Sequence, residues 1–189
     1  TYRWGTMTSV VSTKEDKKDD EERPKKIVIN HAPKRPKTLP CDVHLTQIKG
    51  EKWYVFIGKL DGYPFEVFAG KATMKLPEKG TITKAKSKTY LFEAEGIAPV
   101  NILDTFGEHG SYCYSKMLSH GVPLWSIMDM CDKILENVLG FNKAIGRIIK
   151  KYIKTDDIKY FKCGECGSTK MIFQEGCVMC QNCGNSKCS

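Results

Sequence analysis

The stretch WYVFIGKLDGYPFEVF, residues 53–68, contains the clearest strand pattern in the chain. Its first half alternates between the two faces of a strand. One face carries Trp53, Val55 and Ile57, and the other carries Tyr54 and Phe56. Asp61-Gly62 is a strong signal for a two-residue hairpin turn, and a second strand is expected from Phe65 to Phe68. The stretch therefore predicts an antiparallel hairpin.

Further strands and then helices are predicted on either side of this hairpin. A strand near Cys41 and a turn at Lys49-Gly50 precede it and complete a meander, and residues 81–95 are expected to add one or two strands. The apolar period then becomes helical. Helices are predicted at about 104–119, at 124–138 before Gly140, and at 141–152. Strands followed by helices indicate an α+β fold, here a β meander followed by a helical bundle.

Six of the nine cysteines lie within residues 163–188, and their spacing predicts a metal site. Cys163 with Cys166, and Cys180 with Cys183, each form a C-x-x-C-G motif. Two thiolates at such a turn can bind one side of a tetrahedral zinc ion, and the following glycine lets the backbone turn toward the sulfurs. A short hairpin between the two motifs would bring them together. The spacing thus predicts a zinc ribbon with these four cysteines as ligands.

This ligand set leaves Cys177 and Cys188 as a second pair of thiols. In another assignment Cys177 and Cys180 form the second half of the metal site, which leaves Cys183 and Cys188; the motif Cys177 to Cys180 lacks the following glycine. In a third, one of the spare thiols is inert.

Composition narrows the class of protein. The 189 residues include 41% hydrophobic residues and carry a formal net charge of +8. The first 30 residues contain no apolar core of a signal peptide, so clustered cysteines favour a reducing cytoplasm, and no apolar run is long enough to span a membrane. The basic charge, with Trp53 and Phe56 as stacking residues, suggests an alternative hypothesis: a nucleic-acid-binding zinc ribbon. Only four arginines occur, which makes nucleic acid a less favoured partner.

The chain is expected to divide into four parts. Residues 1–13 look like the end of a larger fold, and residues 14–40 read as a flexible charged linker because they are rich in alternating charges and prolines. Residues 41–154 form the α+β domain. Residues 155–189 hold the zinc ribbon and the spare cysteines.

Several motifs, in order, resemble the C-terminal end of adenosylcobalamin-dependent (class II) ribonucleotide reductase. They are Thr1-Tyr2-Arg3 with Gly5, Lys34-Arg35-Pro36, the stretch DGYPFEVF at 61–68, HGVPL at 120–124, and the tail from Glu175 to Cys188. Residues 1–13 would then be the remnant of the catalytic barrel end. The resemblance covers nearly the whole chain except the linker and residues 69–100.

The resemblance implies the accessory C-terminal part of an enzyme that makes deoxyribonucleotides for DNA synthesis. The catalytic barrel and the adenosylcobalamin site would lie outside this chain, so the chain would not be catalytic alone. Cys177 and Cys188 would be redox-active, would reduce the active-site disulfide formed in each turnover, and would themselves be reduced by thioredoxin. Competing hypotheses are the nucleic-acid-binding module and a purely structural subunit.

Overall fold

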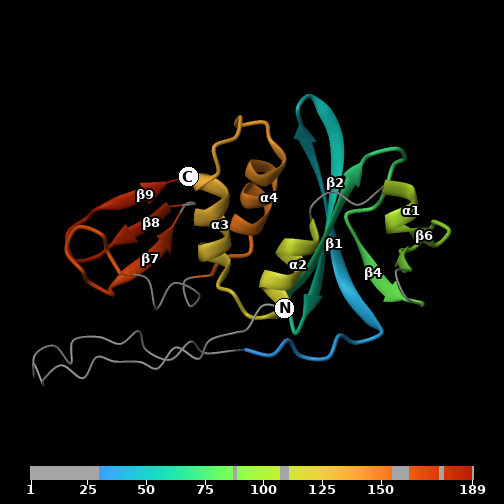
Figure 1. Cartoon of the computed structure of the whole chain (residues 1–189), viewed down its shortest axis with the longest axis horizontal. Coiled ribbons are helices and arrows are strands. Elements are labelled where there is room, and N and C mark those ends of the chain that lie inside the picture. Colours follow the sequence, from blue (N-terminus) through green and yellow to red (C-terminus); the bar gives the residue numbers. More distant parts are fainter. Residues whose placement is uncertain (1–29, 87–88, 107–110, 155–161, 175–176, 189) are drawn as a thin grey trace, which may run out of the picture.

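The computed structural model describes residues 30–86, 89–106, 111–154, 162–174 and 177–188. The expected barrel remnant, residues 1–13, and the acidic part of the expected linker lie outside these ranges. Within them the chain forms one large antiparallel sheet, four helices and a small second sheet (Figure 1). The prediction of a mixed α+β fold is therefore confirmed.

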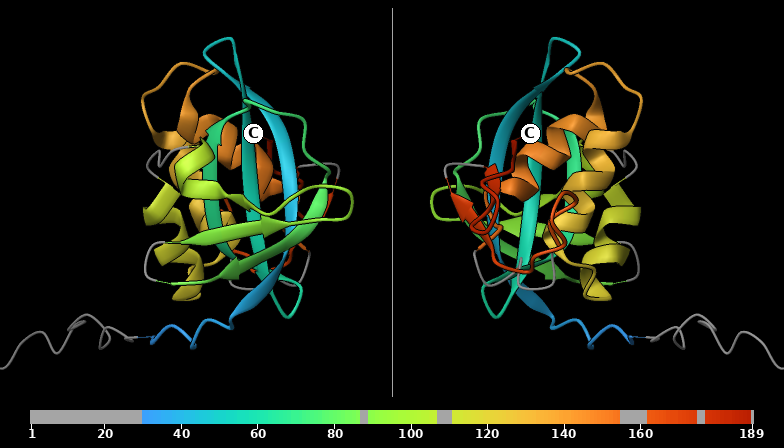
Figure 2. Two further views of the ribbon diagram at one scale, coloured as in Figure 1. Left: turned by 90° about the vertical axis from the view of Figure 1, so that its right-hand side faces the viewer. Right: turned by 90° about the vertical axis from the view of Figure 1, so that its left-hand side faces the viewer.

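The large sheet has six strands in the order β3-β2-β1-β4-β5-β6, and all neighbouring pairs are antiparallel. The strands are β1 (Thr38–Ile48), β2 (Glu51–Leu60), β3 (Tyr63–Lys71), β4 (Lys79–Lys84), β5 (Tyr90–Glu93) and β6 (Val100–Asn101). Strand β1 is long enough to pair with β4 along its first half and with β2 along its second. The sheet curls, so that β4 and β5 cross the direction of β1 and β2 (Figure 2).

The two predicted hairpin turns are present. Lys49 and Gly50 have φ values of 49° and 83°, and Asp61 and Gly62 have φ values of 50° and 82°. Two successive residues at positive φ are the mark of a type I′ turn, whose twist matches that of the flanking strands. These turns set the register that places Val43 opposite Phe56 and Phe56 opposite Phe68.

Strand β2 is buried on both faces, because the sheet separates two apolar layers. Val55 and Ile57 pack against the helices, and Tyr54 and Phe56 pack into the concave side of the curled sheet. Trp53 packs against Phe141 at one end of the helical layer. Trp53 is 7% exposed and Phe56 is 0% exposed, so the stacking surface that the nucleic-acid hypothesis needs is absent from these residues.

The helices are α1 (Ile102–Phe106), α2 (Ser111–Ser119), α3 (Leu124–Lys133) and α4 (Phe141–Lys150). The last three cover one face of β2 and β3, and the first packs at the other face (Figures 1 and 2). The prediction of a helical bundle is not confirmed, because the core of this layer contains sheet residues as well as helix residues. The helix expected at 104–119 is two helices, α1 and α2. The amphipathic face predicted for 141–152 is confirmed over α4, where Ile145, Ile148 and Ile149 are buried.

The helix predicted to run from 124 to 138 ends at Lys133, so this prediction was wrong at its C-terminal end. Ile134 is extended, with ψ at 124°, and Leu135 is fully exposed. The physical reason lies in the next helix. The Glu136 carboxylate accepts hydrogen bonds from the backbone N–H groups of Phe141 and Asn142, at 3.0 Å each, and so caps the N-terminus of α4. Helical periodicity cannot reveal this competing interaction.

The segment before β1 is tied to the domain at two points. The Asn30 carbonyl lies 2.7 Å from His120 Nδ1. Arg35 forms a bidentate ion pair with Glu66 on β3, with distances of 2.7 and 2.6 Å. Arg35 and Glu66 belong to two of the motifs that carried the resemblance, and the structure joins them.

A second unit follows the domain, and we call residues 162–188 the cysteine module. Its three antiparallel strands are β7 (Met171–Gln174), β8 (Cys177–Cys180) and β9 (Ser186–Cys188), with β8 in the centre. Met171 and Phe173 pack against the helical layer of the domain, and Figure 1 shows the module beside α3. One face of the small sheet is therefore held against the domain.

Candidate metal centre and cysteine pair

The four cysteines of the two C-x-x-C-G motifs come together at one end of the cysteine module. The Sγ atoms of Cys163, Cys166, Cys180 and Cys183 all lie within 4.8 Å of one another. Cys163 Sγ lies 3.5 Å from Cys183 Sγ, and Cys166 Sγ lies 3.6 Å from Cys180 Sγ. Each close contact thus joins one motif to the other.

The two motifs have the same turn, which explains how the sequence positions the sulfurs. The glycine that follows each motif is at positive φ, 68° at Gly167 and 73° at Gly184. The N–H of Gly167 donates to the Cys163 carbonyl, and the N–H of Gly184 donates to the Cys180 carbonyl, both at 2.9 Å. A side chain at either glycine would strain this turn.

The spacing of the sulfurs fits a tetrahedral zinc ion. With Zn–S bonds of about 2.3 Å, tetrahedral geometry separates the sulfurs by about 3.8 Å. The two observed contacts, 3.5 and 3.6 Å, are close to that value. Cys163 and Cys180 are buried while Cys166 and Cys183 are exposed, so the group lies at the surface with half of its ligands shielded. These four residues could hold a metal such as zinc.

Backbone amides around the group favour thiolates. Hydrogen bonds from the backbone of Cys183 and of Asn182 lower the pKa of Cys180 to about 6. The backbone of Asn185 lowers the pKa of Cys183, but hydrogen bonds with the neighbouring sulfurs of Cys166 and Cys163 outweigh it and raise that pKa to about 12. Crowded sulfurs cannot all lose their protons without a cation. A zinc ion would supply the positive charge that this cluster needs.

Cys177 lies apart from the four-cysteine group. Its sulfur is in a disulfide. Its backbone is paired with Cys188 on strand β9, directly opposite. Residues directly opposite in an antiparallel pair have Cα atoms about 4.5 or 5.5 Å apart, and both separations lie within the range that a disulfide spans. The side chain of Cys188 lies outside the part that the structure describes.

Strand alternation places Cys177 on the face of β8 opposite to Cys180. Val178 and Cys180 are buried, and they lie in register with Phe173 and Met171, which pack on the domain. Cys177 alternates with this set and is only half-buried. Cys177 is therefore on the outer face of the module. Cys180, one of the four clustered cysteines, is on the inner face. The alternative assignment, in which Cys177 and Cys180 form the second half of the metal site, would require Cys177 in the cluster. The four clustered sulfurs instead include Cys183.

Beyond the cysteines, sequence reasoning missed a polar cluster on β1 and β2. Lys59 Nζ lies 2.8 Å from the Asp42 carboxylate, and the Tyr152 hydroxyl donates to the same carboxylate at 2.9 Å. His44 Nε2 lies 2.6 Å from the Tyr152 oxygen. The cluster fastens the end of the α4 segment to β1, so it supports the start of the tether toward the cysteine module. No sequence motif predicts this polar cluster, because its members come from separate parts of the chain.

The fold and this site define an α+β domain with an attached cysteine module. The family model described as the NrdJ homologue C-terminal domain matches residues 39–154, and the chain belongs to this family. The match covers more than half of the chain and ends before the cysteine module. No curated protein and no solved structure matches the chain.

Family membership agrees with the resemblance to the C-terminal part of class II ribonucleotide reductase. It associates the chain with a cobalamin-dependent ribonucleotide reductase and implies a catalytic reductase partner. The helices of the described ranges are all too short or too polar to cross a membrane.

Proposed function

We propose that this chain is the accessory C-terminal part of an adenosylcobalamin-dependent ribonucleotide reductase and that its cysteine module carries electrons to the catalytic site. Adenosylcobalamin supplies the radical chemistry in the catalytic portion, outside this chain. The observation that carries the proposal is the separate placement of two sets of cysteines in the module. Four sulfurs form a metal-sized cluster, and Cys177 lies on the other face of β8 in a disulfide, opposite Cys188.

In this proposal zinc holds Cys163, Cys166, Cys180 and Cys183 and folds the module. A thiolate in a closed zinc site is a poor partner for exchange, because the metal occupies its lone pair and fixes its position. The metal thus keeps four of the six thiols out of redox chemistry. The module can then move as a folded unit with one reactive pair.

The reactive pair is Cys177 and Cys188. In the reduced pair, one thiolate attacks the active-site disulfide, forms a mixed disulfide and displaces one active-site thiolate. The second thiol of the pair then attacks the mixed disulfide, which closes the Cys177–Cys188 bond and releases the second active-site thiol. Two electrons and two protons pass to the catalytic site, and thioredoxin returns them to the module. The disulfide at Cys177 corresponds to the oxidised state of this cycle.

The parts of the chain have distinct roles in this proposal. Residues 1–13 would continue the catalytic barrel and residues 14–40 would link it to the domain at 41–154. Residues 155–189 would carry the module. A flexible connection raises the effective concentration of the reactive pair at the catalytic site to about millimolar. Exchange of this kind suits the reducing cytoplasm, where disulfides are transient and catalytic.

The experiment joins this chain to its catalytic portion and follows deoxyribonucleotide formation with thioredoxin as reductant. Changing Cys177→Ser or Cys188→Ser should permit one turnover and stop the next, and dithiothreitol should restore repeated turnover because it is small enough to reach the catalytic site. Cys113→Ser is the matched control, since Cys113 is an exposed free cysteine in the domain. Each variant should keep its zinc. Repeated turnover with thioredoxin in both variants at the wild-type rate would exclude the electron-carrying role.

A further inference from the structure

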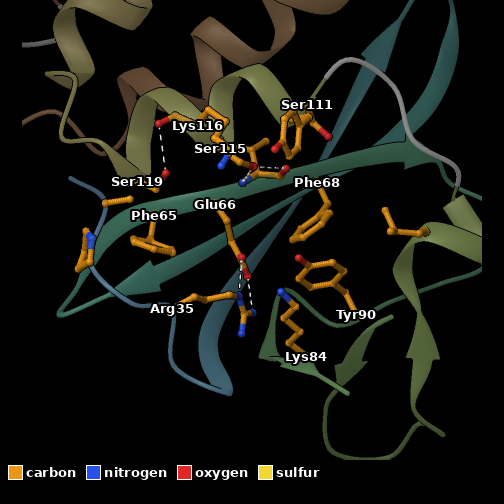
Figure 3. Close-up of a pocket in the computed structure, with 15 residues that line it drawn as sticks. Arg35, Phe65, Glu66, Phe68, Lys84, Tyr90, Ser111, Ser115, Lys116 and Ser119 are labelled. Carbon is orange, nitrogen blue, oxygen red and sulfur yellow. Dashed lines mark hydrogen bonds and ion pairs between the residues drawn. The ribbon is translucent and has the colours of Figure 1, made fainter. Parts of the chain in front are cut away.

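A cavity of about 500 Å³ opens at the seam of the curled sheet. It lies between the edge strand β3, the β4 and β5 strands, helix α2 and the segment around Pro33 (Figure 3). Its volume is in the range of pockets that bind small organic molecules. Because the sheet curls without closing, the cavity has a floor of sheet residues and an open mouth.

Arg35 and Glu66 form the floor of this cavity and are not free to bind a ligand. Besides its two bonds to Glu66, the Arg35 guanidinium donates to three backbone carbonyls. These five bonds use all five of its N–H groups. The ion pair is therefore structural: it attaches the segment before β1 to β3 and leaves the floor without net charge.

Two lysines at the cavity carry charge that the floor does not neutralise. Lys84 Nζ lies 5.7 Å from the centre of the Tyr90 ring, and Lys116 Nζ lies 5.5 Å from the centre of the Tyr112 ring. Within the described ranges, neither lysine forms an ion pair. In Figure 3 the Lys84 side chain extends toward Tyr90 and the floor of the cavity. The cavity thus pairs free cations with aromatic rings.

A hydroxyl that lines the cavity adds a polar group. Ser111 lines the cavity, is 3% exposed and makes no hydrogen bond to any residue that the structure describes. Ser115, one turn further along α2, is fully used: it accepts from the Val67 N–H and donates to the Val67 carbonyl, both at 2.9 Å. The Ser111 hydroxyl is therefore available to a ligand in the cavity, whereas the Ser115 hydroxyl is not.

The two hydrogen bonds of Ser115 argue against a peptide as the occupant of the cavity. A peptide adds to a sheet edge through the free N–H and C=O groups of that edge. At the cavity, the edge groups of β3 at Val67 are already bonded to Ser115. The remaining apolar surface is aromatic: the Phe68 and Tyr90 rings have centroids 4.8 Å apart. Such a surface suits a flat ring better than a strand.

We propose that this cavity binds a small aromatic anion, that is, a flat ring joined to a phosphate or carboxylate group. The ring packs on Tyr90 and Phe68, the anion pairs with the ammonium groups of Lys84 and Lys116, and the Ser111 hydroxyl supplies a hydrogen bond. The proposal is independent of the electron-carrying role of the cysteine module. The cavity belongs to the α+β domain, whereas the electron-carrying role belongs to the cysteine module.

Binding is tested on the whole chain by amide NMR titration and calorimetry, with adenosine monophosphate and phenyl phosphate as probes. Both should bind and shift signals of residues around the cavity. Adenosine alone and inorganic phosphate alone should bind at least about tenfold more weakly, because each lacks half of the contacts. Binding of phosphate as tight as that of the two full probes would overturn the role of the ring. No shift at the cavity with either probe at about 5 mM would overturn the site itself, because that limit leaves only negligible affinity.

Variants assign the contacts. Lys84→Met with Lys116→Met should weaken the binding of both probes at least about tenfold, since charge-assisted hydrogen bonds are the strong ones. Lys52→Met with Lys75→Met is the matched control, since it makes the same change of charge at exposed lysines outside the cavity. Ser111→Ala should weaken binding by about threefold to tenfold with an unchanged melting temperature. Equal affinity in the cavity pair and the control pair would show that the lysines do not hold the anion, and would overturn the proposal.

Discussion

The domain and the cysteine module are both antiparallel sheets, but different interactions hold them. In the domain, apolar side chains fill both sides of β2, and aromatic rings such as Phe56, Phe92 and Phe106 contact one another on the concave side. In the module, the buried residues among those described are Cys163, Val178 and Cys180. A sheet this small buries too little surface to fold alone, so we expect a metal and the disulfide of Cys177 to supply the stability that packing does not.

The largest expected effect comes from removing the metal that we assign to the module. Chelation of zinc should unfold residues 162–188 and leave the domain folded, because structural zinc in small modules contributes about 10–16 kcal/mol of folding free energy. Amide NMR spectra before and after chelation measure this, together with zinc content. Loss of signals of the module with the signals of β1–β5 unchanged is the expected result.

Cys163→Ser and Cys113→Ser sharpen this test, since both replace one free cysteine. The first should release zinc and unfold the module, and the second should do neither. A module that keeps its spectrum after complete removal of zinc would show that packing on α3 is enough, and the contrast between the two regions would disappear.

An intermediate effect on stability is expected when a large side chain is removed from the core of the domain. Phe56 is fully buried between Phe92 and Phe106. Phe56→Ala should lower the free energy of unfolding of the domain by about 3–5 kcal/mol, because it removes a large apolar side chain and leaves a cavity. Urea denaturation followed by tryptophan fluorescence measures the loss.

The metal content of the same variant tests whether the two regions are independent. Under conditions where the domain is still folded, Phe56→Ala should bind zinc with wild-type stoichiometry, since no ligand is changed. Tyr112→Ala is a surface control, because Tyr112 is 60% exposed and its removal opens no core cavity. Loss of zinc from Phe56→Ala would mean that the module depends on the domain for its fold.

The smallest expected effect is the pH dependence of the polar cluster on β1. Burial raises the pKa of Asp42, but hydrogen bonds from Lys59 and Tyr152 outweigh it and hold the pKa below its ordinary value of 3.8. A carboxyl whose pKa is lower in the folded state stabilises the fold above its unfolded pKa, and this stabilisation is lost as the pH falls through the folded value. The contribution of Asp42 should therefore be complete above about pH 4 and decline below it.

Asp42→Asn checks this sign. Wild-type stability should fall more steeply than that of Asp42→Asn as the pH is lowered from about 5 to about 2.5, when both are measured by urea denaturation. Glu51→Gln is a suitable comparison, since Glu51 pairs with Lys71 in solvent and both side chains are more than half exposed. Identical slopes in the wild type and Asp42→Asn would show that the cluster adds nothing to stability.

Sequence reasoning succeeded where the structure depends on local spacing. Alternation placed the residues of β2 on the correct faces, two dipeptides predicted the type I′ turns, and C-x-x-C-G spacing named the cysteines whose sulfurs the structure brings together. It failed at the end of α3, because Glu136 is used as the cap of α4 rather than as a helix residue.

Features formed by residues close together in the chain were determined by the sequence alone. Strand faces, hairpin turns and the two cysteine motifs follow from side-chain type and glycine placement. The curl of the sheet was decided only by the tertiary structure, and with it the pairing of Arg35 with Glu66, the cavity beside Tyr90, and the position of Cys177 on the face away from the domain. These features depend on contacts between residues far apart in the chain. Their free energy comes from burying two surfaces against each other, and no single segment contains both surfaces.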